Sequence, residues 1–178
     1  MPGIRPGCVV NSAALFDYDS SEAFSIAAFD AHMHVNLAAP ILLARELHRM
    51  TPAGEQSVVV NLLDQKLYSL NPDFLSYTLS KAALETATTM LAQALAPKLR
   101  VVGVAPGLTM PSHLQSPEDF AATHVLSPLG ESSRPEEVAD AVAFAAGNRA
   151  LTGSTIIVDA GQHLERFARD FSFIKRKQ

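Results

Sequence analysis

The strongest constraint on the fold is a regular alternation of short apolar runs with helical stretches. Each apolar run stops at polar or small residues, which is typical of buried strands. The predicted strands are 8–11, 57–63, 99–106 and 153–161. The predicted helices between and after them are 28–50, 77–95 and 133–147. Strands separated by helices of this length predict an α/β fold with a parallel sheet that is covered by helices on both faces.

Local signals support these boundaries. Pro97 ends the helix 77–95, and Ser133 is the expected N-cap of the last helix, which Gly147 closes. The stretch 107–134 is richer in Pro, Ser and His, so it predicts a long loop, with a short helix near 117–122. Long loops in compact domains usually have a function, and we predict that this one contacts substrate. With 178 residues, the chain is expected to form a single domain.

Composition argues against several classes of partner. A net charge of −4 is unsuited to binding nucleic acid or an acidic membrane surface. No apolar run reaches the roughly 18 residues that a membrane-spanning helix needs. Cys8 is the only cysteine, so no intrachain disulfide can form, and a cytoplasmic location is expected. The six histidines are scattered, and no metal site is predicted.

Candidate catalytic side chains gather at one end of the predicted sheet. Asp64 and the segments 11–14 and 106–109 all follow strand ends, where open parallel sheets bind ligands. Tyr77 and Lys81 are four residues apart on a predicted helix and therefore share one face. An ammonium beside a phenol lowers the pKa of the phenol, which favours a role in proton transfer.

The order and spacing of five motifs resemble the short-chain dehydrogenase/reductase family. The motifs are "VVNSA", Asn36 in "MHVN", "YTLSK", "APGL" and "IIVDAG", and they extend from about Cys8 to His163. The resemblance implies a Rossmann-like fold and an oxidoreductase that uses NAD(P)H on a small-molecule substrate. It also implies a homo-oligomer, either a dimer or a tetramer.

The resemblance also assigns roles to individual residues. Tyr77 would donate the proton, Lys81 would lower the pKa of Tyr77 and bind the nicotinamide ribose, and Asn36 would hold a water molecule in a proton relay. The residues implied to contact the cofactor are Asn11, Ser12, Ala13, Tyr77, Lys81, Pro106, Gly107, Leu108 and Thr109.

Asp64 narrows the expected reaction, because most family members have a serine at this place ahead of the tyrosine. The chain in this respect resembles the pteridine reductases and related dihydropteridine or dihydrofolate-type reductases. These enzymes reduce a ring C=N bond, for which a carboxylate can assist protonation of nitrogen and accept N–H groups of the substrate. Phe16 would stack the heterocycle against the nicotinamide, and Thr109 would replace a serine of their Pro-Gly-Leu-Ser turn. NADP(H) is the expected cofactor, although NAD(H) stays open.

The family's Gly-rich phosphate-binding turn has no counterpart in the sequence. "MPGIRPG" contains two glycines, but neither a strand precedes them nor a helix follows. The chain therefore resembles the C-terminal part of a family member, N-terminally truncated, and strand 8–11 is expected to be an exposed edge that invites association. Two alternatives stay open. One is a carbonyl or hydroxyl oxidoreductase in which Asp64 is incidental, and the other is a noncatalytic remnant that oligomerises through its last helix and strand.

Overall fold

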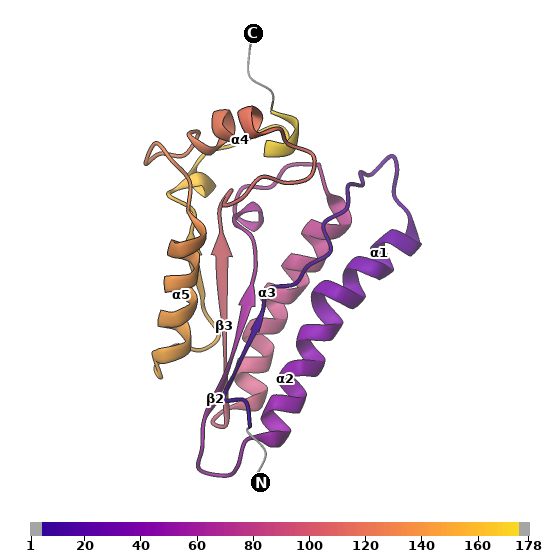
Figure 1. Ribbon diagram of the computed structural model, residues 1–178. Helices are drawn as coiled ribbons and strands as arrows, with labels where there is room; N and C mark the ends of the chain where they lie inside the picture. Colours follow the sequence, from indigo (N-terminus) through magenta and orange to yellow (C-terminus); the bar gives the residue numbers. More distant parts are fainter. Residues whose placement is uncertain (1–4, 175–178) are drawn as a thin grey trace.

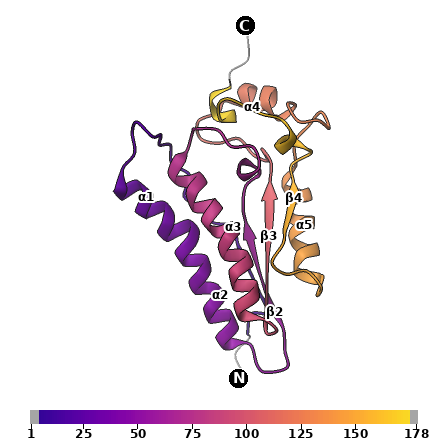
Figure 2. The ribbon, with the colours of Figure 1, turned by 180° about the vertical axis from the view of Figure 1, so that it is seen from behind.

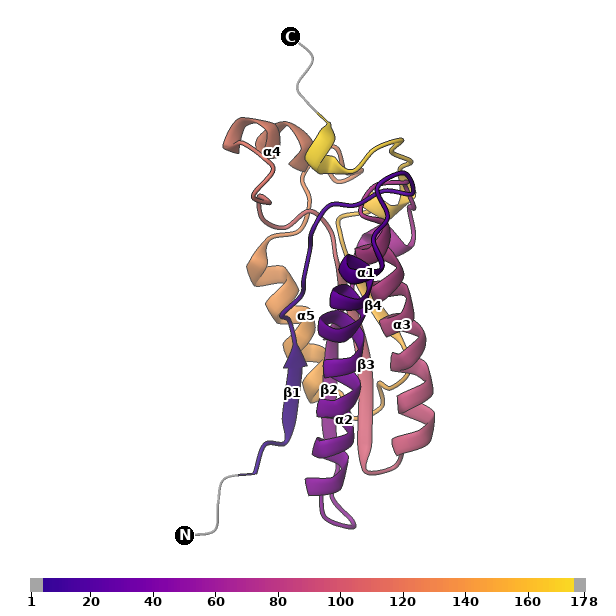
Figure 3. The same cartoon turned by 90° about the vertical axis from the view of Figure 1, so that its right-hand side faces the viewer.

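The computed structural model describes residues 5–174 and contains a four-stranded parallel sheet. The strands are β1 (Cys8–Asn11), β2 (Ser57–Leu62), β3 (Leu99–Pro106) and β4 (Thr155–Val158), and they lie side by side in chain order. Figure 3 shows this order from β1 at one edge to β4 at the other. The predicted Rossmann-like α/β architecture is confirmed.

Helices cover both faces of the sheet. They are α1 (Ile26–Met33), α2 (Ala39–Met50), α3 (Leu75–Leu95), α4 (Pro117–His124) and α5 (Pro135–Gly147), with a π-helix (His34–Ala38) that joins α1 to α2. Short 3-10 turns span Gln65–Leu67, Gln162–Leu164 and Phe171–Phe173. In Figures 1 and 2, α2 and α3 lie on one side of the strands and α5 on the other. The 3-10 turn Phe171–Phe173, close to the C-terminus, lies beside α4 at the carboxyl end of β3.

The alternation of side chains along the strands separates two cores. Val59 and Val101 pack with Ala44 and Leu47 of α2 and with Ala92 of α3. The neighbouring strand positions face α5 and pack around Ala145; they are Val58, Val60, Val102 and Val104. Both faces of β2 and β3 are therefore buried, as the continuous apolar runs predict.

Several predicted boundaries need correction. Helix 28–50 begins at Ile26 and contains the π-helix, α3 begins at Leu75, and the short helix near 117–122 extends to His124. The N-cap of α5 is Arg134 rather than Ser133. The backbone N–H of Arg134 donates to the Glu137 carboxylate over 2.8 Å, whereas the Ser133 hydroxyl pairs with that of Thr109 at 3.0 Å.

One helical stretch is long and apolar enough to cross a membrane by length and composition only, although it contains no uninterrupted apolar run of 18 residues. The continuous helical stretch Ile26–Met50 has 25 residues and a mean hydropathy of 1.3. In the structure, Ala44 and Leu47 of this stretch belong to the core between α2 and the sheet. Leu42 and Leu43 are exposed, so the apolar character extends beyond the face that the sheet buries.

Strand β1 is an edge strand, as predicted. Within residues 5–174 it pairs only with β2, and the side chains of Cys8 and Val10 are exposed. The first four residues of "MPGIRPG" lie outside the described part of the chain.

Candidate active site

The largest group of predicted site residues borders a cavity of about 470 Å³ at the carboxyl ends of the strands. Parallel strands end at one edge, so the segments that follow β1, β2 and β3 meet there. The wall is completed by the first turns of α3 and by residues 170–172. Predicted site residues in this wall are Ser12, Phe16, Asp64, Tyr77, Lys81, Pro106, Gly107, Leu108 and Thr109.

Asp64 and Tyr77 form a hydrogen-bonded pair in this wall. The Tyr77 hydroxyl donates to Oδ2 of Asp64 over 2.7 Å. Oδ1 of Asp64 accepts the backbone N–H of Lys66 at 2.8 Å, because Asp64 caps the 3-10 turn that follows β2. Both carboxylate oxygens are thus held, and one of them is fixed against the phenol.

Burial governs the protonation of this pair. It raises the pKa of Tyr77 well above its ordinary value, and the charge of Asp64 and the hydrogen bond to it act in the same direction. The expected lowering of the Tyr77 pKa by Lys81 is therefore not met in this arrangement. Burial also raises the pKa of Asp64, although the N–H of Lys66, the Tyr77 hydroxyl and the charge of Lys81 oppose it. The site therefore favours a neutral phenol, and burial shifts the carboxyl group of Asp64 toward its protonated form.

Lys81 lies one helical turn from Tyr77. Its Nζ donates to the backbone oxygen of Leu62 over 2.6 Å and lies 5.7 Å from the centre of the Tyr77 ring. Burial lowers the pKa of Lys81, while Asp64 opposes that shift. An ammonium has three N–H donors, so donors beyond the bond to Leu62 are available to the cavity that Lys81 borders.

The turn after β3 is held by backbone and side-chain hydrogen bonds. Leu108 donates its N–H to Oε1 of Gln162 over 2.8 Å, and the Thr109 hydroxyl donates to the oxygen of Gly107 over 2.9 Å. A Cβ at Gly107 would lie 2.9 Å from Cα of Asp159, so a side chain there would displace the backbone. Glycine is therefore required at this position by close packing against Asp159 and Ser132.

Two predicted cofactor residues are not among the cavity residues. Asn11 donates its side-chain amide to Asn61 over 2.7 Å, and Asn61 in turn donates to Thr88 over 2.9 Å. Ala13 is exposed between Ser12 and Ala14, which do border the cavity. Asn11 therefore connects β1 to β2 and α3 inside the protein.

The Asn36 side chain fixes the loop that follows β1. Its oxygen accepts the N–H of Leu15 at 2.8 Å, and its amide donates to the oxygen of Leu15 and to the Ser80 hydroxyl, both over 2.9 Å. Nε2 of His32 accepts the N–H of Asp17 in the same loop at 3.3 Å. Asn36 lies in the π-helix and not in the cavity wall, so its predicted role in a water relay stays a prediction.

Replacing Asn36 with alanine is expected to lower the free energy of unfolding by about 1–3 kcal/mol, because the polar groups of Leu15 would lose their partners. Denaturant unfolding monitored by circular dichroism measures this effect. Gln93→Ala, on the exposed face of α3, is the control. Equal midpoints for the two variants would contradict this role for Asn36.

Phe16 borders the cavity, and its role in stacking the substrate stays a prediction. Its ring stacks on Phe74 with centroids 4.2 Å apart and meets the edge of Tyr77 at 4.7 Å. Phe74 precedes α3 and has a left-handed backbone with φ 55°, an uncommon conformation for a bulky residue. The carboxylate of Asp19 accepts the N–H of Ser76 at 2.9 Å and so caps the same helix.

Sequence reasoning did not identify two ion pairs that the C-terminal segment makes near the cavity. Lys66 and Asp170 form an ion pair of 2.8 Å, and both border the cavity. Arg169 pairs with Asp73, also at 2.8 Å. The partners in these pairs lie 104 and 96 residues apart in the chain, so no local pattern could have indicated them.

Comparison with known proteins agrees with these motifs. The family model described as enoyl-(acyl carrier protein) reductase matches residues 5–163. Alternative dihydrofolate reductase 1 (FolM) from Brucella canis, solved with NADP, is 44% identical, with a TM-score of 0.85 over 89% of this chain and 63% of that chain. L-xylulose reductase from Mesocricetus auratus is 32% identical over 86% of this chain and 66% of its own length. Protein FixR from Bradyrhizobium diazoefficiens is 34% identical over 74% of this chain, which spans about half (48%) of FixR. The chain belongs to the short-chain dehydrogenase/reductase family.

Proposed function

We propose that the protein is an NADPH-dependent oxidoreductase that reduces a C=N bond of a pterin or similar heterocycle. The observation that carries this proposal is the hydrogen bond between Tyr77 and Asp64 in the wall of a cavity that Phe16 also borders. A carboxyl group at this position suits protonation of a ring nitrogen. The 44% identity to the dihydrofolate reductases of two Brucella species supports the same substrate class.

The cavity wall suits the nicotinamide end of NADPH. Lys81 offers N–H donors for a ribose, and Gly107 borders the same cavity, where a flat ring can pack against its backbone. Ser12, Leu108 and Thr109 would complete this part of the site. Bound NADPH supplies the hydride. Since the chain spans 63% of the solved NADP-bound reductase, cofactor binding by this chain is part of the proposal.

The residues of the chain would orient the heterocycle and supply the proton. Phe16 offers a ring face for stacking, while Asp64 offers oxygen atoms to the N–H groups of a pterin. The raised pKa of Tyr77 keeps the phenol protonated until it gives its proton to nitrogen. The nearby charge of Lys81 would stabilise the phenolate that forms.

The test is to titrate the chain with NADPH and then to measure NADPH consumption with dihydrobiopterin or dihydrofolate. Saturable binding with turnover of either compound supports the proposal. Faster turnover of carbonyl substrates would favour the carbonyl reductase alternative, which the similarity to L-xylulose reductase supports. Absence of saturable NADPH binding would favour the noncatalytic remnant.

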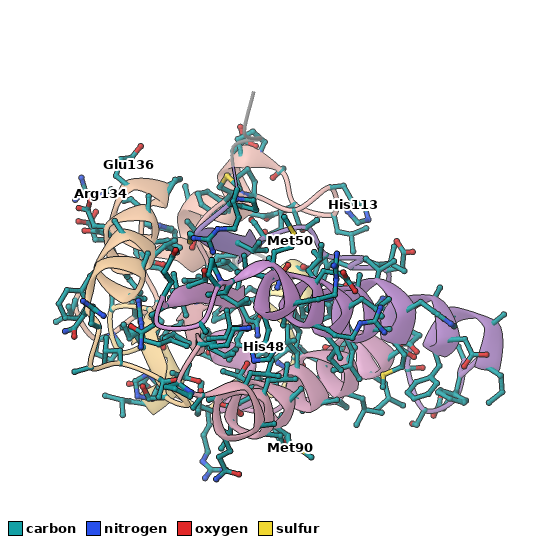
Figure 4. All side chains as sticks on the ribbon, turned by 90° about the horizontal axis from the view of Figure 1, so that it is seen from below. His48, Met50, Met90, His113, Arg134 and Glu136 are labelled. Atoms are coloured by element: carbon teal, nitrogen blue, oxygen red, sulfur yellow. The ribbon has the colours of Figure 1, made fainter. Side chains whose placement is uncertain are left out.

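We infer that the chain forms a homo-oligomer through the outer faces of α2 and α3. Leu43 of α2 and Met90 of α3 are 47% and 63% exposed, and Figure 4 shows Met90 on the outer side of α3. Exposed apolar groups on neighbouring helices are typical of an association surface.

A cytoplasmic location stays a prediction from the sequence.

Introducing lysine at both Leu43 and Met90 is expected to convert the oligomer to a monomer, because two charges would be buried without partners. Light scattering after size-exclusion chromatography measures the mass. Phe144→Lys on α5, where the phenyl ring is 58% exposed, is the control and should leave the mass unchanged. If Phe144→Lys gave a monomer while the double variant stayed an oligomer, the interface would lie at α5.

A further inference from the structure

Lys66 and Asp170 form a buried ion pair beside the Tyr77–Asp64 pair. Their side chains are 3% and 13% exposed, and Nζ of Lys66 donates to Oδ2 of Asp170 over 2.8 Å. The same ammonium donates to the side-chain oxygen of Asn71. Charges are costly to bury, and an apolar pair of the same size is often at least as stable. The location of this pair at the cavity therefore calls for an explanation other than stability.

Lys66 connects the ion pair directly to the candidate catalytic carboxyl group. Its side chain holds Asp170, while its backbone N–H donates to Oδ1 of Asp64 over 2.8 Å. The other oxygen of Asp64 accepts the Tyr77 hydroxyl. The order of contacts is therefore Asp170, Lys66, Asp64 and Tyr77.

The segment that carries Asp170 has other attachments that do not involve Lys66. Arg169 donates to Oδ2 of Asp73 over 2.8 Å, and the backbone N–H of Asp170 donates to the same oxygen, also over 2.8 Å. Phe173 stacks on Phe74 with centroids 5.8 Å apart. These contacts hold the segment independently of Lys66. Oδ1 of Asp170 also accepts the N–H of Ser172 at 3.0 Å, whereas Oδ2 faces Lys66.

We propose that Asp170 is a positioning residue of the reductase site. Through Lys66 it holds Asp64 against Tyr77, and its negative charge favours the protonated form of the Asp64 carboxyl group. The catalytic consequence rests on the proposed function, whereas the effect on Asp64 does not.

The hydrogen-bonding and charged groups that act on Asp64 come from three parts of the chain. Tyr77 and Lys81 belong to α3, Lys66 belongs to the 3-10 turn after β2, and Asp170 belongs to the C-terminal segment. The negative charge of Asp170 raises the pKa of Asp64 and also that of Tyr77. After Tyr77 has given its proton to substrate, a protonated Asp64 can return a proton to Tyr77. Asp170 would therefore help to keep a proton available on Asp64.

The first experiment measures the pKa of Asp64 directly by carboxyl-carbon NMR titration of the full chain. In Asp170→Asn the pKa of Asp64 should shift downward, because a repelling charge is lost and Lys66 is left unpaired. In Lys66→Gln it should shift upward, because the positive charge is lost and Asp170 remains. If the substitutions only loosened the site, solvent would reach Asp64 and its pKa would fall in both variants. That result would overturn the inference.

Asp73→Asn is the matched control, because it removes the other carboxylate that holds the same segment. It should leave the pKa of Asp64 close to the wild-type value. A shift equal to that of Asp170→Asn would show that Asp170 acts only as a tether, and the inference would be wrong.

The second experiment compares pH profiles of kcat/KM for NADPH-dependent reduction of dihydrobiopterin. The pH above which kcat/KM falls should be lower in Asp170→Asn than in the wild type. In Asp170→Glu it should return to the wild-type value. A lack of wild-type activity with every pterin would end the proposed function, while the NMR titration would still decide the role of Asp170. An unchanged NMR titration in Asp170→Asn would overturn that role even in an active enzyme.

Discussion

Tyr77→Phe is expected to lower kcat for dihydropterin reduction by about 10²- to 10⁴-fold, the usual range for loss of a general acid. The substitution removes only the hydroxyl that donates to Asp64. The phenyl ring can keep its edge contact with Phe16, so the fold should be retained. Initial rates of NADPH consumption at saturating substrate measure the effect, and NADPH binding should change little.

Tyr18→Phe is the matched control for this prediction. The Tyr18 ring packs against Phe74 and Phe173, and Tyr18 is not among the cavity residues. The same chemical change there should leave kcat within about twofold of the wild-type value. If Tyr77→Phe behaved like this control, Tyr77 would not be the proton donor, and the proposed chemistry would be wrong.

Asp64→Ser is expected to change the substrate class. Turnover of dihydropterins, as kcat/KM, should fall by about 100-fold or more, because the carboxyl group that assists protonation of nitrogen is lost. Activity with carbonyl compounds should be retained or increase, since a hydroxyl can hold a carbonyl oxygen. Asp17→Ser, an exposed acid in the loop after β1, is the control and should leave the substrate preference unchanged. Parallel losses with both substrate classes in Asp64→Ser would mean that Asp64 supports the site without selecting the substrate.

Asp64→Ser should also change how stability depends on pH. Burial raises the pKa of Asp64 in the folded state above its ordinary value of 3.8. The contribution of Asp64 to stability is therefore fully present below the unfolded-state pKa and is lost as pH rises through the folded-state pKa. Relative to wild type, the variant should gain stability as pH rises across this interval. Urea unfolding of both proteins across a pH series measures the difference, and a constant difference would contradict the raised pKa.

The sequence was sufficient for the arrangement of the sheet and for part of the site. Apolar runs and helical periodicity predicted all four strands, because burial on both faces leaves a continuous apolar pattern. Sheet geometry predicted Asp64 at the carboxyl edge, and the family resemblance predicted its meeting with Tyr77 of α3. The i, i+4 spacing placed Lys81 one turn from Tyr77 on the same helix.

Other features depend on burial and long-range contacts that a linear pattern does not encode. The spacing of Tyr77 and Lys81 predicted a lowered pKa for Tyr77, whereas desolvation and Asp64 raise it in the folded protein. The amide of Asn11 can either line a ligand site or pair inside the protein, and only the register of β1 with β2 brings it to Asn61. The pairing of Lys66 with Asp170 requires the complete fold.

The π-helix between α1 and α2 has a consequence for how the pocket could change. A π-turn accommodates one more residue than an α-turn, and in an α-helix each residue advances the side chains by about 100°. The extra residue is taken up within 34–38, and this wide turn contains Asn36, which holds the loop after β1 through the N–H and the oxygen of Leu15. Deleting one residue from 34–38 would remove this wide turn and with it the placement of Asn36 against Leu15, so we expect the neighbouring Phe16 to shift in the cavity wall.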